Sequence, residues 1–307
     1  MILGLLPPPE AAGGGSPARD LAALADIAVE RGSGAAAAAL AASLADDPEW
    51  APLLAGAPAE PTGWSGPAEA LAEVGLEHDA AALYAATFPA ITAVDLAWSA
   101  RRLAAWGNRP AALTAGERLW HRLGGVPASF LPPALQRLIL PPELVGPCRA
   151  AARAAAVPPA WLVGIVRQES RFDEDATSPA GAIGVAQMVP EAARNLGAQP
   201  EELRDPGTAL RLAAREVGRL AARFGPRLAV VAAAYNAGDR VVATWLVELG
   251  GDPGAALFAA AVPYRETAGY VLDVCEGAAL AGYLGGGTAA TGDGAAAGAT
   301  GSPVPER

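Results

Sequence analysis

The 307-residue chain contains no lysine, so arginine supplies all 22 of its strongly basic side chains, against 32 aspartates and glutamates. The net charge of −10 argues against nucleic acid and anionic membranes as partners, because both recruit proteins through basic patches. We interpret the missing lysine as a composition bias rather than a binding signal. The chain also lacks any run approaching the roughly 20 uninterrupted apolar residues that cross a bilayer, so no membrane span is predicted.

Cysteine and histidine are scarce, with two of each. His78 and His121 have no partners at metal-ligand spacing, so the sequence predicts surface histidines, no metal site and no cofactor. Cys148 and Cys275 lie near the two ends of the segment 145–284. They form either a disulfide or two buried free thiols.

Aromatic residues make up only 6% of the chain and β-branched runs are short, whereas alanine and leucine dominate. This composition predicts an all-α protein, and the length allows two modest domains. Residues 1–19 are expected to be a flexible leader. Its apolar start lacks basic residues and is broken by Pro7–Pro9, which makes it a poor signal peptide. Residues 285–307 are rich in glycine, alanine and threonine and are expected to be disordered.

Residues 20–144 are expected to form an α-helical N-terminal region. Its segments 20–56 and 66–122 have the alanine-rich pattern of short helices, which glycines interrupt. The interruptions and the tryptophans expected to anchor the packing are Gly75, Gly107, Gly124, Gly125, Trp98, Trp106 and Trp120.

A helix is predicted to begin at Pro158-Pro159, because proline fits the first helical turn. Leu162, Ile165, Val166 and Glu169 follow at spacings of three and four, so they share one face of that helix. A carboxyl group on an apolar face loses water, which raises its pKa. Glu169 therefore has the environment of a general acid that stays protonated near neutral pH. The alternative is a glutamate that caps its helix or pairs with Arg167 or Arg171.

Two further segments each allow a binding or a purely structural interpretation. Gly181 and Gly184 allow close approach of the backbone to a sugar, or else form a plain surface turn. Tyr235 and Asn236 end an alanine-rich helix over 228–234, with Gly238 as its stop. The tyrosine either stacks on a sugar or is a buried tyrosine with a satisfied hydroxyl, and the amide has a sugar hydroxyl or the acid itself as its hydrogen-bond partner.

Taken in order, these segments resemble the catalytic signature of the soluble lytic transglycosylases, goose-lysozyme-like enzymes that cut the glycan of peptidoglycan. The resemblance covers roughly residues 145–284, and four ordered segments make it specific. The matching residues are Glu169-Ser170-x-Phe172 with Ala176-x-Ser178, Gly181-Ala182-x-Gly184 and Gln187-x-x-Pro190; Ala234-Tyr235-Asn236-Ala237-Gly238; Val262-Pro263-Tyr264-x-Glu266-Thr267; and Tyr270-Val271.

The resemblance implies a lysozyme-like helical catalytic domain over 145–284, preceded by a superhelix-like helical region over 20–144. Arg137–Pro141 resembles the family's linker between the two. Glu169 would be the catalytic acid and base. The residues implied to contact the glycan are Ser178, Gln187, Tyr235, Asn236 and Tyr270.

The chain departs from the family pattern at four positions of these segments. Ala186 and Val189 stand where the family usually has methionine, Ala260 stands in place of an acidic residue, and Ala268 in place of arginine. The loss of two methionines is expected to widen the pocket and to change affinity more than chemistry.

No second carboxylate has a convincing motif position, although ordinary glycosidases use two. Asp173, Glu174 and Asp175 are expected to form a solvated cap, and Glu266 to be a structural anion at a helix start. A single acid suits a lytic transglycosylase that closes a 1,6-anhydroMurNAc ring and needs no water. The alternatives are a lysozyme-type muramidase, a non-catalytic peptidoglycan-binding module, and a purely structural helical protein. The resemblance implies glycan strands as the partner, a monomer, and a periplasmic or cell-envelope location.

Overall fold

The computed structural model describes residues 66–87, 92–122, 133–251 and 253–284. The expected leader, the helices expected within 20–56, Gly124, Gly125 and the tail over 285–307 lie outside the described residues. Within the described ranges the regular structure is helical, and β-structure is limited to isolated bridges between Thr177 and Ile183 and between Ile183 and Met188. The prediction of an all-α protein is confirmed.

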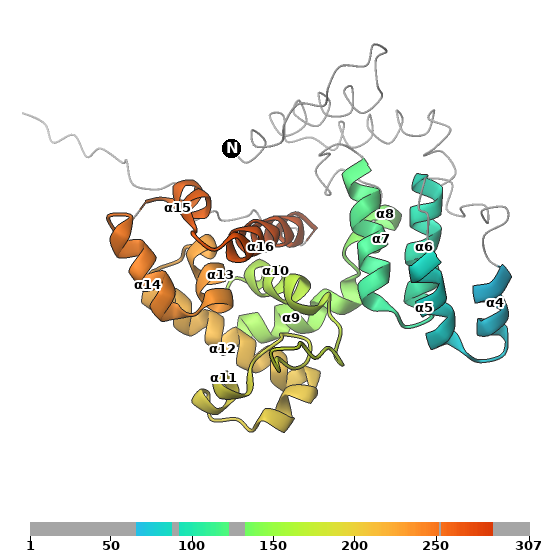
Figure 1. Ribbon diagram of the computed structural model, residues 1–307, viewed down its shortest axis with the longest axis horizontal. Coiled ribbons are helices and arrows are strands. Elements are labelled where there is room, and N and C mark those ends of the chain that lie inside the picture. The colour runs from blue at the N-terminus through green and yellow to red at the C-terminus, as the bar shows by residue number, and fades with distance from the viewer. Residues whose placement is uncertain (1–65, 88–91, 123–132, 252, 285–307) are drawn as a thin grey trace, which may run out of the picture.

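The N-terminal part consists of helix pairs that meet at glycines. Gly75 and Gly107 lie between consecutive helices, as predicted, and both have a positive φ. Figure 1 shows α6 (Ala93–Ala105) and α7 (Arg109–Arg122) side by side. The helices are α4 (Gly66–Glu73), α5 (Glu77–Thr87), α6 (Ala93–Ala105) and α7 (Arg109–Arg122).

The predicted tryptophan anchors lie in two cores. Trp98 is buried and Trp106 is partly buried, and both rings pack against Tyr84 with centroids 5.6 and 5.8 Å away. Trp120 packs instead against the main core of the protein. Helices α6 and α7 thus contribute to both cores, whereas Ala68 of α4 and Tyr84 of α5 belong to the smaller one.

The C-terminal part packs its helices around one buried helix. Six of its elements (α8, α9, α10, α11, η2 and α12) begin with proline at the first turn, where the missing N–H costs no hydrogen bond. The elements are α8 (Pro133–Ile139), α9 (Pro142–Ala154), α10 (Pro159–Ser170), α11 (Pro190–Asn195), the 3₁₀ turn η2 (Pro200–Arg204), α12 (Pro206–Phe224), α13 (Leu228–Ala237), α14 (Asp239–Glu248), α15 (Ala255–Ala261) and α16 (Arg265–Leu284).

Helix α13 is the central element, and its residues from Ala229 to Ala234 are all buried. It packs against α12, α14, α15 and α16 (Figure 1). Helices α10 and α16 also pack against each other, because Gly164 has no side chain to separate them. A Cβ at Gly164 would lie 2.6 Å from the carbonyl oxygen of Val274. This close approach fixes the distance between the helix that carries Glu169 and the last helix of the domain.

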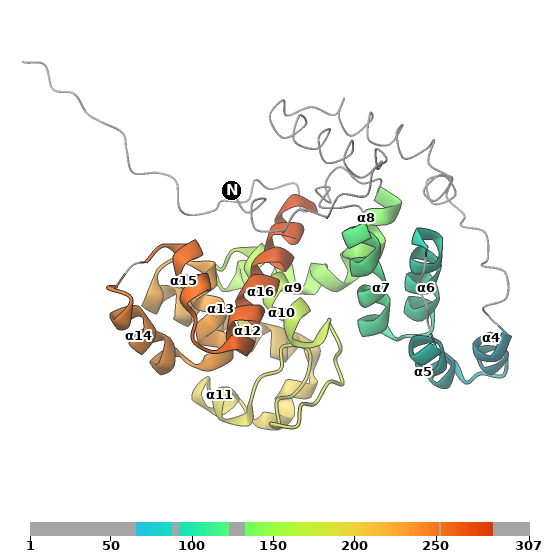
Figure 2. The same ribbon diagram turned by 45° about the horizontal axis from the view of Figure 1, so that its top comes forward.

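The N-terminal helices and the C-terminal part are joined by α8 and α9 (Figure 2). Leu113 and Leu119 of α7 belong to the same buried cluster as the residues of α10 and α13. The expected linker Arg137–Pro141 spans the end of α8 and the N-cap of α9. The expected domain boundary between residues 144 and 145 falls inside α9, which begins at Pro142.

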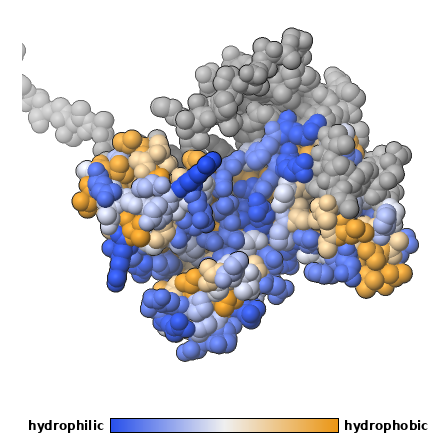
Figure 3. Space-filling view, viewed as in Figure 1, coloured by the Kyte–Doolittle hydropathy of each residue, from blue (hydrophilic) through white to orange (hydrophobic). Residues whose placement is uncertain are grey.

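The molecular face of Figure 3 is largely hydrophilic over its centre, with hydrophobic groups toward its two ends. Exposed apolar side chains of the described residues include Val74 and Leu76 between α4 and α5, and Val247 and Leu257 on α14 and α15. None of the helices in the described ranges combines the length and apolar character needed to cross a membrane.

Candidate active site

Helix α10 presents Glu169 at its C-terminal end. The helix starts at Pro159, and Leu162, Ile165 and Val166 on the predicted face are fully buried. Glu169 continues that face in the last turn. The predicted helix start and buried stripe are confirmed.

The Glu169 carboxyl is held by a tyrosine rather than by a cation. The hydroxyl of Tyr270 on α16 donates a hydrogen bond of 2.6 Å to Oε1 of Glu169. Burial raises the pKa of Glu169 from 4.5 to about 7, and the hydrogen bond from Tyr270 offsets part of this effect. The predicted rise in pKa is confirmed. The alternative pairing of Glu169 with Arg167 or Arg171 is wrong, because both guanidiniums contact Glu117 instead.

A second tyrosine lies close to the same carboxyl. Tyr235, in the last turn of α13, donates a hydrogen bond of 3.0 Å to the backbone carbonyl of Ala186. Burial and the charge of Glu169 hold the pKa of Tyr235 well above 10, and the same two causes raise the pKa of Tyr270. Both tyrosines are therefore neutral donors at neutral pH, on the side of α10 that Glu169 faces.

The loop between α10 and α11 is held by the side chains that the sequence assigned to substrate. Gln187 uses its side-chain amide to donate to the carbonyls of Ala176 and Gly184, at 3.1 and 3.0 Å. Ser178 accepts a hydrogen bond of 3.0 Å from the backbone N–H of Ala182. Gln187 and Ser178 therefore shape the loop, and no hydrogen bond joins either of them to Glu169 among the described residues.

Gly184 allows the loop to pass against η2. Its φ is +71°, and a Cβ there would lie 2.3 Å from the carbonyl oxygen of Leu203. Any larger residue would move the loop, so Gly184 is a packing requirement and not a plain surface turn.

Backbone strain gathers at the two ends of this loop. Four non-glycine residues of the described chain have a positive φ, and three of them are Arg171, Phe172 and Gln187. Such residues cost roughly 1–3 kcal/mol each and persist only where the surroundings hold them. The turn that follows Glu169 is thus a conformation that other contacts must maintain.

The start of α16 is tied to the end of α13. Thr267, which is buried, donates from its hydroxyl to Oδ1 of Asn236 at 2.7 Å. The carbonyl of the exposed Asn236 amide is therefore used for structure, and no hydrogen bond links Asn236 to Glu169 within the described part of the chain. The ring of Tyr264 is exposed and packs edge-on against Trp245, with centroids 5.0 Å apart.

Two of the altered positions differ in their environment. Ala186 is fully buried, and its carbonyl accepts the hydrogen bond from Tyr235. Val189 is exposed and is the N-cap residue of α11. A larger side chain at position 186 would therefore have to displace packed atoms, whereas position 189 tolerates one.

The other acidic candidates lie apart from Glu169. Asp173 accepts a hydrogen bond from the backbone N–H of Asp175, and the exposed Glu174 pairs with Arg109 at 2.8 Å. Glu266 is exposed in the first turn of α16, as expected for a structural anion. Within the described residues, none of these carboxylates shares a contact with Glu169.

Cysteines and metal-binding groups show no catalytic arrangement in the described chain. Cys148 and Cys275 are free thiols, which decides between the two alternatives. Burial raises the pKa of Cys148 to about 12 and that of Cys275 to about 11, so both are inert at neutral pH. The described ranges contain no cluster of histidine, cysteine and carboxylate side chains that could hold a metal ion.

Sequence reasoning missed three parts of this site. Thr267 binds Asn236, Ala186 offers a backbone carbonyl, and Glu117 pairs with the arginines beside Glu169. Thr267 belongs to the Glu266-Thr267 pair, so the sequence pattern could have indicated that it has a role in the site. A backbone carbonyl leaves no trace in the sequence, and Glu117 lies 50 residues or more from its partners.

The fold and the site together define a lysozyme-like helical domain in which Tyr270 binds the half-buried Glu169 at the end of α10. Comparison with known proteins agrees, since residues 146–256 match the family model of the transglycosylase SLT domain. The C-terminal part of the chain is therefore similar to the transglycosylase SLT domain over residues 146–256.

Curated relatives carry the same family name. The soluble lytic murein transglycosylase of Escherichia coli K12 is 32% identical over 126 residues, which cover 38% of this chain and 20% of that protein. The protein of that name from Salmonella typhimurium LT2 is 32% identical over 122 residues, covering 37% and 19%. The match thus spans about a fifth of the length of these relatives.

Solved structures show that the fold likeness reaches beyond the SLT domain. The 70 kDa soluble lytic transglycosylase from Escherichia coli has a TM-score of 0.56 at 24% identity, and covers 88% of this chain and 46% of its own. A complex of the 70 kDa soluble lytic transglycosylase with bulgecin A has a TM-score of 0.58 at 22% identity, with the same coverage. The fold is therefore shared over most of the chain.

Proposed function

We propose that the chain is a peptidoglycan lytic transglycosylase that cleaves the β-1,4 bond between MurNAc and GlcNAc with Glu169. The observation that carries the proposal is the environment of Glu169: a half-buried residue whose carboxyl has a pKa of about 7, is bound by Tyr270, and makes no ion pair among the described residues. Such a group is protonated in a large fraction of molecules at neutral pH, which a general acid requires.

The reaction needs one group that first gives and then takes a proton. Glu169 donates its proton to the glycosidic oxygen, and the bond from that oxygen to C1 of MurNAc breaks with development of an oxocarbenium-like centre. The resulting carboxylate accepts the proton of the 6-hydroxyl of the same sugar, while O6 forms a bond to C1. The products are a 1,6-anhydroMurNAc end and a free GlcNAc hydroxyl, and Glu169 regains its proton.

Tyr270 suits both halves of this cycle. Because its hydroxyl donates to Oε1, the exchangeable proton of Glu169 belongs on Oε2. The same hydrogen bond stabilises the carboxylate after the first step, which limits the rise in pKa caused by burial. General acid–base action typically contributes about 10²–10⁴-fold, so sugar distortion and groove contacts must supply much of the remainder.

The groove is proposed to lie where the loop after α10 faces the ends of α13 and α16. Tyr235 and Tyr270 border the acid directly, and Ser178, Gln187 and Asn236 support the proposed groove through the loop and α13. We further propose that the protein acts as a monomer on glycan strands in the periplasm or cell envelope.

The decisive experiment compares the products of the wild type, Glu169→Gln and Glu266→Gln on purified sacculi by mass spectrometry. Glu266 is a matched control because it is an exposed glutamate in one of the same family-like segments. We expect 1,6-anhydro ends from the wild type and Glu266→Gln, and a loss of at least about 10³-fold for Glu169→Gln.

Other outcomes separate the alternatives. Reducing MurNAc ends would assign the chain to the lysozyme-type muramidases. Binding of sacculi without cleavage by any of the three proteins would assign it to the non-catalytic peptidoglycan-binding modules. Loss of activity in Glu266→Gln as well would contradict the single-acid mechanism.

A further inference from the structure

A carboxylate from the N-terminal helices reaches the end of α10. Oε1 of Glu117, on α7, lies 3.0 Å from Nη2 of Arg167, and Oε2 lies 3.6 Å from Nη2 of Arg171. The Glu117 side chain is 17% exposed and that of Arg167 only 8%. Arg167 and Arg171 stand two residues before and two residues after Glu169. One side chain from α7 therefore holds the last turn of α10 at both ends.

The backbone at Arg171 depends on an outside contact. Arg171 caps α10 in the left-handed conformation (φ 51°, ψ 40°), and its N–H donates to the carbonyl of Arg167 at 3.0 Å. Phe172, next in the chain, also has a positive φ of 61°. Glycine adopts this capping conformation without strain, but it has no guanidinium to pair with Glu117. The strained turn and the ion pair are therefore parts of one arrangement.

This turn connects to the loop segment against which Tyr235 rests. Ser170, between Glu169 and the strained turn, donates from its hydroxyl to the carbonyl of Val185 at 2.6 Å. Ala186, the next residue, accepts the hydrogen bond from Tyr235. A change in the last turn of α10 therefore moves the acid and the loop against which Tyr235 rests.

We propose that Glu117 is a positioning residue, which holds Arg167 and Arg171 so that the Glu169 carboxyl stays buried against Tyr270. Its kinetic consequence rests on the function proposed above. Its structural consequence, the burial of Glu169, does not. The active site would then need α7 as well as the SLT domain, because residues 146–256 do not include Glu117.

Other charged groups surround this contact. Asp273 and Glu276 face it from α16, and His121 of α7 pairs with Glu276 at 3.2 Å. His121, Asp273 and Glu276 are all exposed, so water screens them more than it screens the pair of Glu117 with Arg167. Glu117 is the carboxylate that contacts both arginines.

The first test measures the pKa of Glu169 by ¹³C NMR titration of the 307-residue chain, with the resonance assigned from Glu169→Gln. The variants are Glu117→Gln and Arg171→Asn, since asparagine tolerates the left-handed conformation but carries no charge. Arg109→Gln is the matched control, because it breaks the exposed pair of Arg109 with Glu174 between α7 and the same loop. We expect the pKa of Glu169 to fall by about one unit in the two variants and to stay unchanged in the control, because a displaced carboxyl regains water.

The second test measures cleavage of purified sacculi between pH 5 and pH 9. For Glu117→Gln and Arg171→Asn we expect turnover to fall roughly tenfold with the apparent KM within about twofold, since the acid is misplaced while the groove remains. The basic limb of the pH profile should move to lower pH. A variant that is only less stable would lose activity in proportion to its unfolded fraction, and the pH dependence of its cleavage would not move.

The proposal is overturned if the pKa of Glu169 and the pH profile of both variants equal those of Arg109→Gln. If Glu117→Gln does not fold, Arg171→Asn alone decides the outcome. If the wild type does not cleave sacculi, the proposed function fails, and the NMR titration still decides whether Glu117 positions Glu169.

Discussion

The two sides of α10 place carboxylates in contrasting surroundings. On one side Glu169 is buried against the hydroxyl of Tyr270, makes no ion pair within the described chain, and has a pKa of about 7. On the other side the half-buried Glu117 contacts the buried guanidinium of Arg167 and that of Arg171, whose side chain is 41% exposed. Burial without a cation produces an acid, whereas burial with two cations produces an anchor. The same residue type thus serves chemistry on one side and position on the other.

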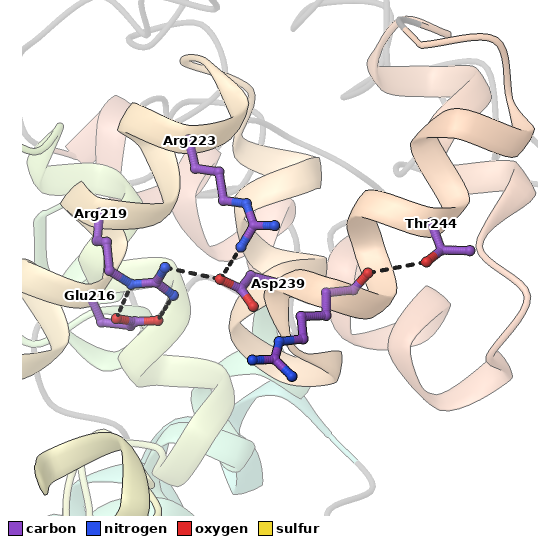
Figure 4. Close-up of polar contacts among 6 residues, drawn as sticks. Glu216, Arg219, Arg223, Asp239 and Thr244 are labelled. Atoms are coloured by element: carbon purple, nitrogen blue, oxygen red, sulfur yellow. Dashed lines mark hydrogen bonds and ion pairs between the residues drawn. The ribbon is translucent and has the colours of Figure 1, made fainter. Parts of the chain in front are cut away.

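A third cluster shows what exposure does to the same residue types. Figure 4 shows Arg219 on α12 between Glu216 and Asp239, with a second arginine, Arg223, also bound to Asp239. Arg219 lies 2.6 Å from Glu216 and 2.9 Å from Asp239, so this geometry is at least as tight as that around Glu117. The side chain of Arg219 is 46% exposed, however, against 8% for Arg167. Water therefore screens the cluster of Figure 4 far more strongly.

The largest effect on stability is expected from Glu117→Ala. Removal of one partner leaves the Arg167 guanidinium buried without a counter-charge, which typically costs about 3–5 kcal/mol. Urea unfolding at pH 7 measures the free energy of unfolding. The double variant Glu117→Leu with Arg167→Met should recover most of the loss, because no charge then remains buried. A loss below about 1 kcal/mol for Glu117→Ala would place this contact with the exposed cluster of Figure 4.

Glu169→Gln should stabilise the protein in a pH-dependent way. The pKa of Glu169 is about 7 in the folded state and near 4.5 when unfolded, so the folded state binds more protons between these values. The contribution of Glu169 to stability is complete below pH 4.5 and is lost as pH rises through 7. Glutamine does not titrate, so the variant should gain roughly 3 kcal/mol over the wild type between pH 4.5 and pH 8.

Urea unfolding of both proteins at pH 5 and pH 8 measures this difference, with Glu266→Gln as the exposed control. A gap between wild type and Glu169→Gln that is equal at both pH values would mean that Glu169 titrates like an ordinary glutamate. The same result would weaken the proposed role as an acid.

Tyr270→Phe should change the pKa of Glu169 while leaving its carboxyl group in the site. The hydrogen bond from Tyr270 lowers the pKa of Glu169, so its loss should raise that pKa above 7. The basic limb of the cleavage profile should shift to higher pH, opposite to the shift expected for Glu117→Gln. Turnover should fall roughly 10- to 150-fold, since a hydrogen bond to a charged group contributes about 1.5–3 kcal/mol. If the basic limb of the pH profile stays in place, the group whose deprotonation ends cleavage at high pH is not Glu169.

The smallest effect is expected from Asp239→Asn in the cluster of Figure 4. Exposed ion pairs contribute about 0–1 kcal/mol, and the loss should disappear in roughly 1 M salt. Thermal unfolding at low and high salt measures it. A loss comparable to that of Glu117→Ala would show that exposure does not separate the two kinds of cluster.

Local features of this site were predictable from the sequence because they depend on neighbours along the chain. Proline marks the start of α10, the spacing of Leu162, Ile165 and Val166 marks its buried face, and Glu169 inherits a raised pKa from that face. The ordered segments also identified Tyr270 as a groove residue, but not as the donor to Glu169.

The remaining features depend on contacts between distant elements. Gln187 and Ser178 have polar groups that suit a sugar equally well, and only the folded loop shows them bound to its own backbone. Glu117 belongs to a helix outside the resembling segment, so no motif connected it with Arg167. The type of a side chain predicts which interactions it can make. The packing of distant elements determines which partner it contacts.

The hydrogen bond from Tyr270 to Glu169 joins residues 101 positions apart, the second of them on the last helix of the described chain. A ribosome releases α10 long before α16. Until α16 has emerged and packed against Gly164, Glu169 is an ordinary hydrated glutamate on a partial chain. The carboxyl of Glu169 would therefore gain its raised pKa only after α16 has folded onto α10.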